Sequence, residues 1–319
     1  VGVYLAFLID KIADRGSNVC SWDVTRDGIR NTFGRQAIPM VWDYAEGNMF
    51  SNSSGCFDNA LDWIVKVICL LPANKKGFVF HNSAQNDNGL RDIAVSTDPP
   101  YYDNIGYADL SDFFYIWMRQ ALKSIYPDLF RTMLVPKVEE LTAMSHRFKG
   151  GKSEAYKFFE NGMLQTFKQI NAYVRDDVPT TVYYAYKQSE DDGDATVSTG
   201  WETMLSAIIQ TGFVITGTWP MRTEMANRAI GINTNALASS IVLVCRKRHA
   251  DAPVCTRRDF INTLKRELKP ALKKLQQSNI APVDLAQSAI GPGMGVYSRF
   301  SKVLEADGTP MSVRSALQI

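Results

Sequence analysis

A double-proline corner between a strand-like run and a helix constrains the fold of this chain more than any other feature. The strand-like run is residues 93–97, the corner is Asp-Pro-Pro-Tyr at residues 98–101, and the helical pattern spans residues 109–125. Each proline fixes φ and biases the residue before it towards extended backbone, so the strand has to end at the corner. Strand, corner and helix in this order predict an α/β domain with the corner at the carboxyl end of a strand, where open α/β sheets bind ligands.

Strand-like and helical patterns alternate along the rest of the chain. Strand-like runs occupy residues 77–82, 180–186, 213–219 and 239–245, and helical patterns occupy residues 153–174, residues from about 200 onward, and residues 256–277. This alternation predicts a mainly parallel sheet covered on both faces, with the last two strands as an antiparallel edge hairpin. We expect three segments: a helical segment at 1–76 that packs on the core, the core at 77–248, and a helical, basic extension at 249–319.

The corner carries the groups that methylation of an amine requires. The exocyclic amino group of adenine or cytosine is a poor nucleophile, because its lone pair is delocalised into the ring. Acceptors for its N–H protons favour the more tetrahedral nitrogen that attacks a methylsulfonium, and Asp98 and the carbonyl of Pro99 are the candidate acceptors. Pro100 stiffens the corner, and Tyr101 offers a flat face to a base that has been flipped out of a duplex.

Two other interpretations fit the same residues. Asp-Pro-Pro is common in turns, and residues 99–102 also fit a Pro-Pro-x-Tyr peptide that WW-type modules bind as polyproline II. Such peptides usually lie in disordered linkers, whereas this one lies between an apolar run and a strongly patterned helix that Asp109 can cap. The context therefore favours a catalytic corner.

Composition limits the partners and the compartment. The formal net charge is only +2, so contact with nucleic acid requires local basic patches. The five cysteines are scattered without a C-x-x-C pair, which argues against a zinc ribbon or another metal site in this chain and favours reduced thiols in the cytoplasm. No apolar run approaches the ~20 residues that span a bilayer, and no signal peptide is apparent. The chain starts with Val-Gly-Val-Tyr inside an amphipathic pattern, so we expect it to be a fragment of a longer protein.

Residues 98–119, DPPYYDNIGYADLSDFFYIWMR, resemble the motif of amino-group DNA methyltransferases. More narrowly, they resemble the large adenine-specific DNA methylases of the DUF1156 type, which are often described as carrying a zinc ribbon. The resemblance extends over nearly the whole chain through IRNTFGRQAIPMVWDYAEGNMF, WPMRTEMANRAIGINTNALASSIVLVCR and AIGPGMGVYSRFSKVLEADG. The first motif is specific to the broad class, and the others point to the subfamily.

This resemblance implies a Rossmann-like, S-adenosylmethionine-dependent methyltransferase fold. The fold would be incomplete, because the family carries its first strands, its glycine-rich cofactor loop and its zinc ribbon upstream. The implied reaction is methylation of adenine N6 in DNA, since Asp before Pro-Pro fits adenine better than cytosine, where Ser is commoner. Host modification or phage defence, with protein partners in such a complex, is the implied role.

The resemblance also indicates where the cofactor would be held. A short polar turn in the family touches the adenine of S-adenosylmethionine, and here Asn82, Ser83 and Ala84 occupy that place, with Asp98 nearby in sequence. The chain departs there from the commoner Gly-Asp-Ala. Residues 291–295, Gly-Pro-Gly-Met-Gly, are the one glycine-rich candidate for a cofactor loop, but the helical pattern before them favours a structural turn.

Residues 219–235 connect the last two strands, and this connection is long for a hairpin, whose loops usually have ~2–5 residues. In the family, this loop helps to wall the target-base pocket. The candidate substrate-binding residues are those near the corner and in this loop: Tyr102, Asn104, Trp219, Arg222, Glu224, Asn227 and Arg228. Base stacking by Trp219 and contacts from the polar residues to base edges or phosphates are one interpretation. A polar surface loop with internal salt bridges is the equal alternative.

Three smaller features have open interpretations. His81 fits a satisfied strand-end histidine better than a general base. Lys137, Glu139 and Glu140 resemble a family signature without an evident physical role. The helical pattern at residues 256–277 carries seven basic residues, either as a solvated face or as a phosphate-contacting surface: Arg257, Arg258, Lys265, Arg266, Lys269, Lys273 and Lys274.

The sequence therefore supports two functions of different kinds. The first is an S-adenosylmethionine-dependent methyltransferase that acts on adenine in DNA, with an RNA amino group as the nearby alternative. The second is a non-catalytic nucleic-acid-binding or assembly fragment that retains the fold. Because no convincing cofactor loop is present, we expect residues 1–319 alone to bind the donor weakly or not at all and to be inactive.

Overall fold

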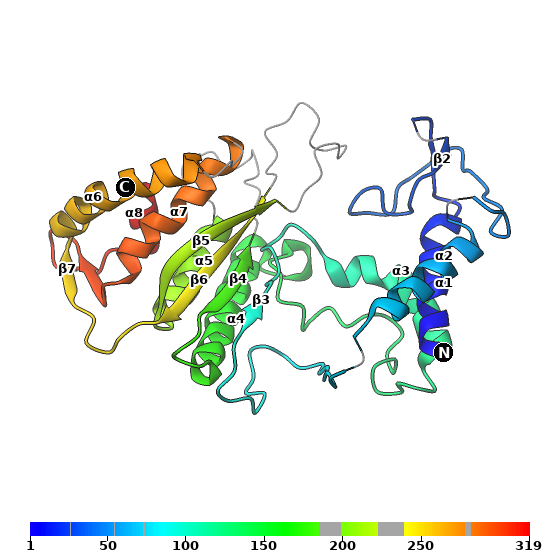
Figure 1. Ribbon diagram of the computed structural model, residues 1–319, viewed down its shortest axis with the longest axis horizontal. Coiled ribbons are helices and arrows are strands. Elements are labelled where there is room, and N and C mark those ends of the chain that lie inside the picture. Colours follow the sequence, from blue (N-terminus) through cyan, green and yellow to red (C-terminus); the bar gives the residue numbers. More distant parts are fainter. Residues whose placement is uncertain (26, 54, 73, 185–198, 223–238, 278–281) are drawn as a thin grey trace. The chain divides into compact units, whose positions relative to one another are not determined.

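The computed structural model describes residues 1–25, 27–53, 55–72, 74–184, 199–222, 239–277 and 282–319 (Figure 1). Two compact units divide these residues, and each is described by itself. The first unit comprises Val1–His81 and Ile105–Glu140, and the second comprises Asn82–Asn104 and Leu141–Ile319. The units therefore divide the chain at other positions than the three expected segments, because residues 105–140 pack with the N-terminal residues.

The first unit is mainly helical. Its core is small and consists of Ala6, Tyr115, Leu122 and Phe130, with Met118 and Val135 packed against it. Ala6 and Tyr115 lie far apart in the sequence, on two different helices, so this cluster packs these two helices against each other. The elements of the unit are α1 (Gly2–Gly16), β1 (Trp22–Asp23), β2 (Gly28–Ile29), α2 (Phe57–Leu70) and α3 (Tyr107–Leu122).

The start of α3 differs from the sequence-based prediction. Gly106, not Asp109, is the N-cap residue, and Asp109 lies within the first turn. A carboxylate in the first turn still interacts favourably with the helix dipole. The amide of Ala108 donates a hydrogen bond to Glu140 Oε1 at 3.1 Å, so a distant glutamate satisfies one of the free N–H groups at this helix end.

The strand expected at residues 77–82 is not formed. The segment is irregular, and the side chains of Phe78, Val79 and Phe80 are 71%, 98% and 71% exposed. A strand needs a neighbour that accepts and donates its backbone hydrogen bonds, and no described strand lies beside this one. The apolar composition that suggested a strand does not supply that partner.

The second unit contains a four-stranded sheet in the order β3-β4-β6-β5. β3 and β4 are parallel, whereas β6 is antiparallel to both of its neighbours, so β5 and β6 form an antiparallel hairpin at one edge. It follows that the carboxyl ends of β3, β4 and β5 lie at the same end of the sheet. The strands are β3 (Ser96–Thr97), β4 (Thr180–Tyr184), β5 (Phe213–Arg222) and β6 (Ser239–Lys247).

Two helices supply much of the core beside the sheet. They are α4 (Gly151–Tyr173), which follows the short 3₁₀ helix Ser145–Arg147, and α5 (Thr199–Gln210). The helix predicted from about residue 200 onward is confirmed as α5, and its apolar residues Trp201, Met204, Leu205, Ile208 and Ile209 are all buried. These side chains share one core cluster with residues of all the longer strands.

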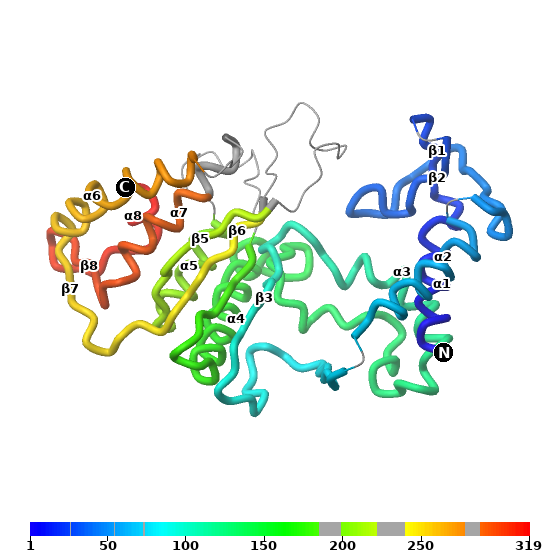
Figure 2. Tube along the Cα trace, in the orientation of Figure 1, coloured from blue at the N-terminus to red at the C-terminus, as the bar shows by residue number. Residues whose placement is uncertain are grey.

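The C-terminal part of the second unit packs on the same core. Figure 2 shows α6 and α7 running side by side. A parallel pair, β7 and β8, lies at their ends. The elements are β7 (Val254–Thr256), α6 (Arg257–Gln277), α7 (Pro282–Ser298), β8 (Lys302–Leu304) and α8 (Val313–Gln318). Among the helices of the described ranges, none is both long and apolar enough to cross a membrane.

Residues 291–295 form neither a cofactor loop nor a turn, because they lie inside α7. A Cβ atom on Gly291 would lie 1.9 Å from Thr218 Cγ2, and one on Gly295 would lie 3.1 Å from the carbonyl oxygen of Ile215. The glycines therefore allow the helix to approach β5 closely. Their role is packing, and the sequence pattern that suggested a turn reflects a helix without bulky side chains on one face.

Candidate functional site

The Asp-Pro-Pro-Tyr corner directly follows β3, the strand at the other edge of the sheet from the hairpin. β3 is short, but it is fixed to β4 by the hydrogen bond from Thr181 N to Val95 O at 3.0 Å. The hydroxyl of Thr181 also donates to Ser96 Oγ at 3.0 Å. Asp98 therefore begins the corner at the carboxyl end of an anchored strand, as the sequence predicted.

The two candidate acceptors of the corner are open. The side chain of Asp98 is exposed, while Pro99 and Pro100 are half-buried. Within the described ranges, neither the Asp98 carboxylate nor the Pro99 carbonyl accepts a hydrogen bond. Two adjacent oxygen acceptors on stiff backbone are therefore available to an N–H donor.

Tyr101 fixes one side of the corner through aromatic contacts. Its ring meets that of Tyr184, at the end of β4, edge to face with a centroid distance of 5.6 Å. Tyr184 in turn packs edge to face on the buried Trp201 at 4.9 Å. Because Tyr101 is half-buried, the corner is tied to the core while Asp98 stays accessible.

Tyr102 turns the chain away from the corner. It has a positive φ of 49°, and its amide donates to Pro100 O at 3.1 Å. Its carbonyl accepts a hydrogen bond from Ala143 N at 2.9 Å, and its ring packs on Phe159 at 5.2 Å. These contacts hold the turn, and substrate contact by Tyr102 stays a prediction.

Trp219 lies level with the corner but not beside it. Strand pairing places Trp219 opposite Val242, Val242 opposite Tyr183, and the residue before Tyr183 opposite Thr97. Asp98 follows Thr97, so Asp98 and Trp219 are separated by three strand spacings, about 14 Å. Trp219 is 67% exposed and therefore available for stacking.

The other candidates for substrate contact lie in different parts of the second unit or outside the described residues. Asn104 is half-buried, and its amide donates to Tyr101 O at 3.0 Å, so it belongs to the turn. Arg222 is the last residue of β5, at the same end of the sheet as the corner. Glu224, Asn227 and Arg228 lie outside the described residues, as does the loop expected to wall a base pocket.

The candidate cofactor residues Asn82, Ser83 and Ala84 are exposed. They form a turn in which Ser83 Oγ accepts a hydrogen bond from Gln85 N at 3.3 Å. Neither these residues nor Asp98 line any of five cavities found in the described part of the chain. None of these five cavities therefore joins the candidate cofactor residues to the corner.

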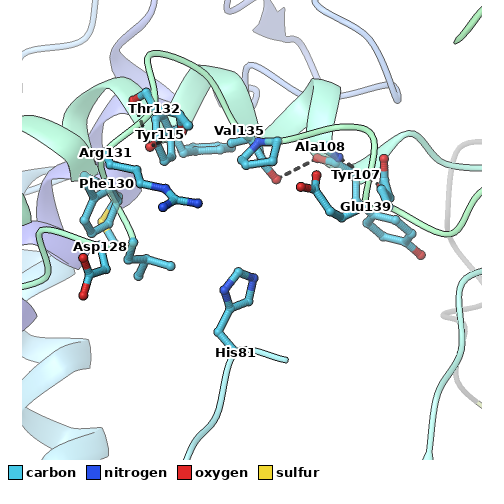
Figure 3. Close-up of a pocket in the computed structure, with 16 residues that line it drawn as sticks. His81, Tyr107, Ala108, Tyr115, Asp128, Phe130, Arg131, Thr132, Val135 and Glu139 are labelled. Atoms are coloured by element: carbon cyan, nitrogen blue, oxygen red, sulfur yellow. Dashed lines mark hydrogen bonds between the residues drawn. The ribbon is translucent and has the colours of Figure 1, made fainter. Parts of the chain in front are cut away.

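The largest of these cavities lies within the first unit, where no site was predicted. Its volume is about 660 Å³, and one face of α3 forms a wall with Phe114, Tyr115 and Met118. Figure 3 shows Arg131 and His81 extending into the same open space from different segments. A cavity of this size, lined by apolar and aromatic side chains with a few charged groups, lies within the size range of small-molecule sites.

Hydrogen bonds fix the loop that forms the other wall of this cavity. Lys137 Nζ contacts Asp112 Oδ2 at 2.7 Å, and Asp112 Oδ1 accepts a hydrogen bond from Val135 N at 2.9 Å. Glu140 holds the start of α3 through Ala108 N, as described above. Lys137 and Glu140, which had no evident role in the sequence, therefore attach residues 128–140 to α3. Glu139 lines the cavity.

Comparison with known proteins adds no assignment. No family model matches this chain, and neither the curated proteins nor the solved structures gave a match. Function is therefore argued from the residues and their geometry.

Proposed function

We propose that the protein is an S-adenosylmethionine-dependent DNA methyltransferase that acts on the N6 amino group of adenine. The observation that carries this proposal is the open pair of acceptors, the Asp98 carboxylate and the Pro99 carbonyl, at the carboxyl end of β3. The parallel β3–β4 pair and the β5–β6 hairpin support it further, because they are compatible with the later part of a methyltransferase sheet.

The corner acts on the amine by accepting hydrogen bonds from its two N–H groups. Hydrogen bonds to Asp98 and Pro99 O orient the nitrogen and favour the tetrahedral geometry in which its lone pair leaves conjugation with the ring. A carboxylate acceptor strengthens its bond as positive charge develops on the nitrogen. Bound S-adenosylmethionine would supply the methyl group, and the part of this chain's own residues is to hold and orient the amine.

Two aromatic residues would contact different parts of the substrate. Tyr101 adjoins the acceptors and is the residue placed to stack on a flipped adenine. Trp219 lies about 14 Å from Asp98 across the sheet, which is too far to stack on the same base. We assign Trp219 to a neighbouring nucleotide, where stacking tolerates any sequence.

The partner in this proposal is DNA, and the setting is host modification or phage defence in the cytoplasm, with other proteins of such a complex. The product test is nucleoside analysis of plasmid DNA from cells that express the protein. We expect N6-methyladenine that is absent from cells without the gene. N4-methylcytosine in its place would reject adenine as the substrate, and N6-methyladenine found only in RNA would reject DNA.

A second function is a non-catalytic nucleic-acid-binding or assembly module. One observation favours it: Asn82, Ser83, Ala84 and Asp98 line none of the main cavities. Calorimetric titration of residues 1–319 with S-adenosylmethionine tests the non-catalytic module. We expect weak or absent binding, which both functions allow, whereas micromolar affinity would reject the non-catalytic module.

A further inference from the structure

A stripe of unpaired cations runs along the exposed side of α6. Arg258, Lys265, Lys269 and Lys273 recur at intervals of seven, four and four residues, which places them on one face of the helix. All four side chains are exposed. The opposite face holds the buried Phe260 and Leu264, so the orientation of the helix is fixed by its packing. These four residues are called the basic stripe.

The acidic groups of the region are already engaged elsewhere. Asp259 accepts a hydrogen bond from the Thr256 hydroxyl at 2.8 Å. Glu267 pairs with Arg266 and with Arg299, and Glu305 pairs with Arg257. In the part of the chain that the structure describes, none of the four stripe residues forms an ion pair. The stripe is therefore an uncompensated linear array of positive charge.

Helix stability does not account for the whole stripe. Lysines near the C-terminal end of a helix interact favourably with its dipole, which covers Lys273. Arg258 lies in the first turn, where the same dipole opposes a positive charge, and no described acid pairs with it. A cation that costs stability at its position suggests a partner outside the chain.

We propose that the basic stripe binds the phosphate backbone of duplex DNA. From Arg258 to Lys273 the helix rises about 22 Å, so its four cations can reach several phosphates of a duplex, which carries one negative charge per ~1.7 Å of its axis. Lysine and arginine on an exposed face position the duplex and read no sequence. The choice of DNA rests on the proposed function, whereas the stripe itself rests on the geometry of α6.

The test measures DNA affinity against salt. Fluorescence anisotropy with a short duplex gives log Kobs as a function of log[NaCl] for the wild-type chain and for a variant with all four stripe residues changed to Gln. The control variant changes four ion-paired cations to Gln and thus lowers the net charge by the same amount: Arg91, Arg175, Lys247 and Arg257. Circular dichroism melting checks that both variants remain folded.

We expect the stripe variant to bind more weakly and its salt slope to fall by about 0.9 for each lost phosphate contact, up to about 3.6 for four. The control should retain most of the wild-type slope. Equal slopes in the wild-type chain and the stripe variant would overturn the proposal. Loss of binding only to single-stranded RNA, or only to phosphatidylserine vesicles, would overturn it in favour of those partners.

The catalytic proposal is tested separately from the proposal that the basic stripe binds DNA. An Asp98→Ala variant should keep the wild-type salt slope, because Asp98 lies outside α6 and its replacement removes no cation. A stripe-dependent slope without any methyl transfer would support the DNA surface and count against the enzyme. Methyl transfer that does not depend on the stripe would support the enzyme and reject this surface.

Discussion

Gly291 of α7 lies so close to Thr218 of β5 that a Cβ atom on the glycine would be 1.9 Å from Thr218 Cγ2. The same Cβ atom would lie 2.6 Å from Thr218 Cβ. Because Thr218 Cβ does not move when the threonine side chain rotates, rotation alone cannot make room. This contact fixes how closely the C-terminal helices approach the sheet. It explains a glycine-rich sequence that otherwise invites a ligand-binding interpretation.

Gly291→Ala should therefore destabilise the second unit. Overpacking of a close contact costs about 1–3 kcal/mol, and the gain in helix propensity returns at most about 1 kcal/mol. Gly293→Ala is the matched control, because its Cβ would meet nothing closer than Leu264 Cδ1 at 4.0 Å. Urea unfolding should give a lower midpoint for the first variant and an unchanged or higher midpoint for the second. Equal midpoints would contradict the close contact.

The ion pair between Asp112 and Lys137 should stabilise the wall of the large cavity. Both side chains are only partly exposed, at 23% and 29%, and Asp112 also accepts the Val135 amide. Asp112→Asn should cost about 1 kcal/mol, because the charge pair is lost while an amide acceptor remains. A double-mutant cycle with Lys137→Met measures the coupling, and a coupling energy near zero would show that the pair does not hold the loop.

Asp10 should make the stability of the first unit depend on pH. Burial raises the pKa of its carboxyl from 3.8 to about 6, and its Oδ1 atom is buried without a partner. Because the folded state binds the proton more tightly, the stabilising contribution is complete below pH 3.8 and is lost as the pH rises through about 6.

Asp10→Asn should consequently be more stable than the wild-type chain at pH 8, by on the order of 1 kcal/mol after allowance for partial exposure. The difference should shrink as the pH approaches 4. Asp62→Asn, at an exposed position on α2, is the control and should show no such trend. Denaturant unfolding at several pH values provides the measurement, and a constant difference across the range would reject the role of Asp10.

Local patterns in the sequence predicted the elements whose cause is local. The buried stripe of α5 and the end of β3 at Asp98 follow from apolar spacing and from proline, and both are found. The same logic failed at residues 77–82, because a strand depends on a neighbour that the segment's own composition does not reveal. It also failed at Gly291, whose spacing reflects contact with a distant strand.

The parts of the site that escaped prediction depend on contacts between distant residues. Glu140 caps α3 from a position 32 residues after Ala108, and no local rule connects the two. The large cavity arises from the same pairing of residues 128–140 with α3. Glu140 and Lys137, whose place in the sequence indicated no physical role, were the signal that the sequence offered for this contact.

The central claim is that Asp98 accepts a hydrogen bond from the amine N–H during methyl transfer. The most direct measurement compares the wild type and Asp98→Ala in the rate at which the protein transfers labelled methyl groups from S-adenosylmethionine to DNA. Asp92→Asn, which removes an exposed carboxylate from the same segment, is the control. We predict a loss of at least about 100-fold for Asp98→Ala with little change in DNA or donor affinity, and an unchanged rate for the control. An unchanged rate for Asp98→Ala would contradict the account.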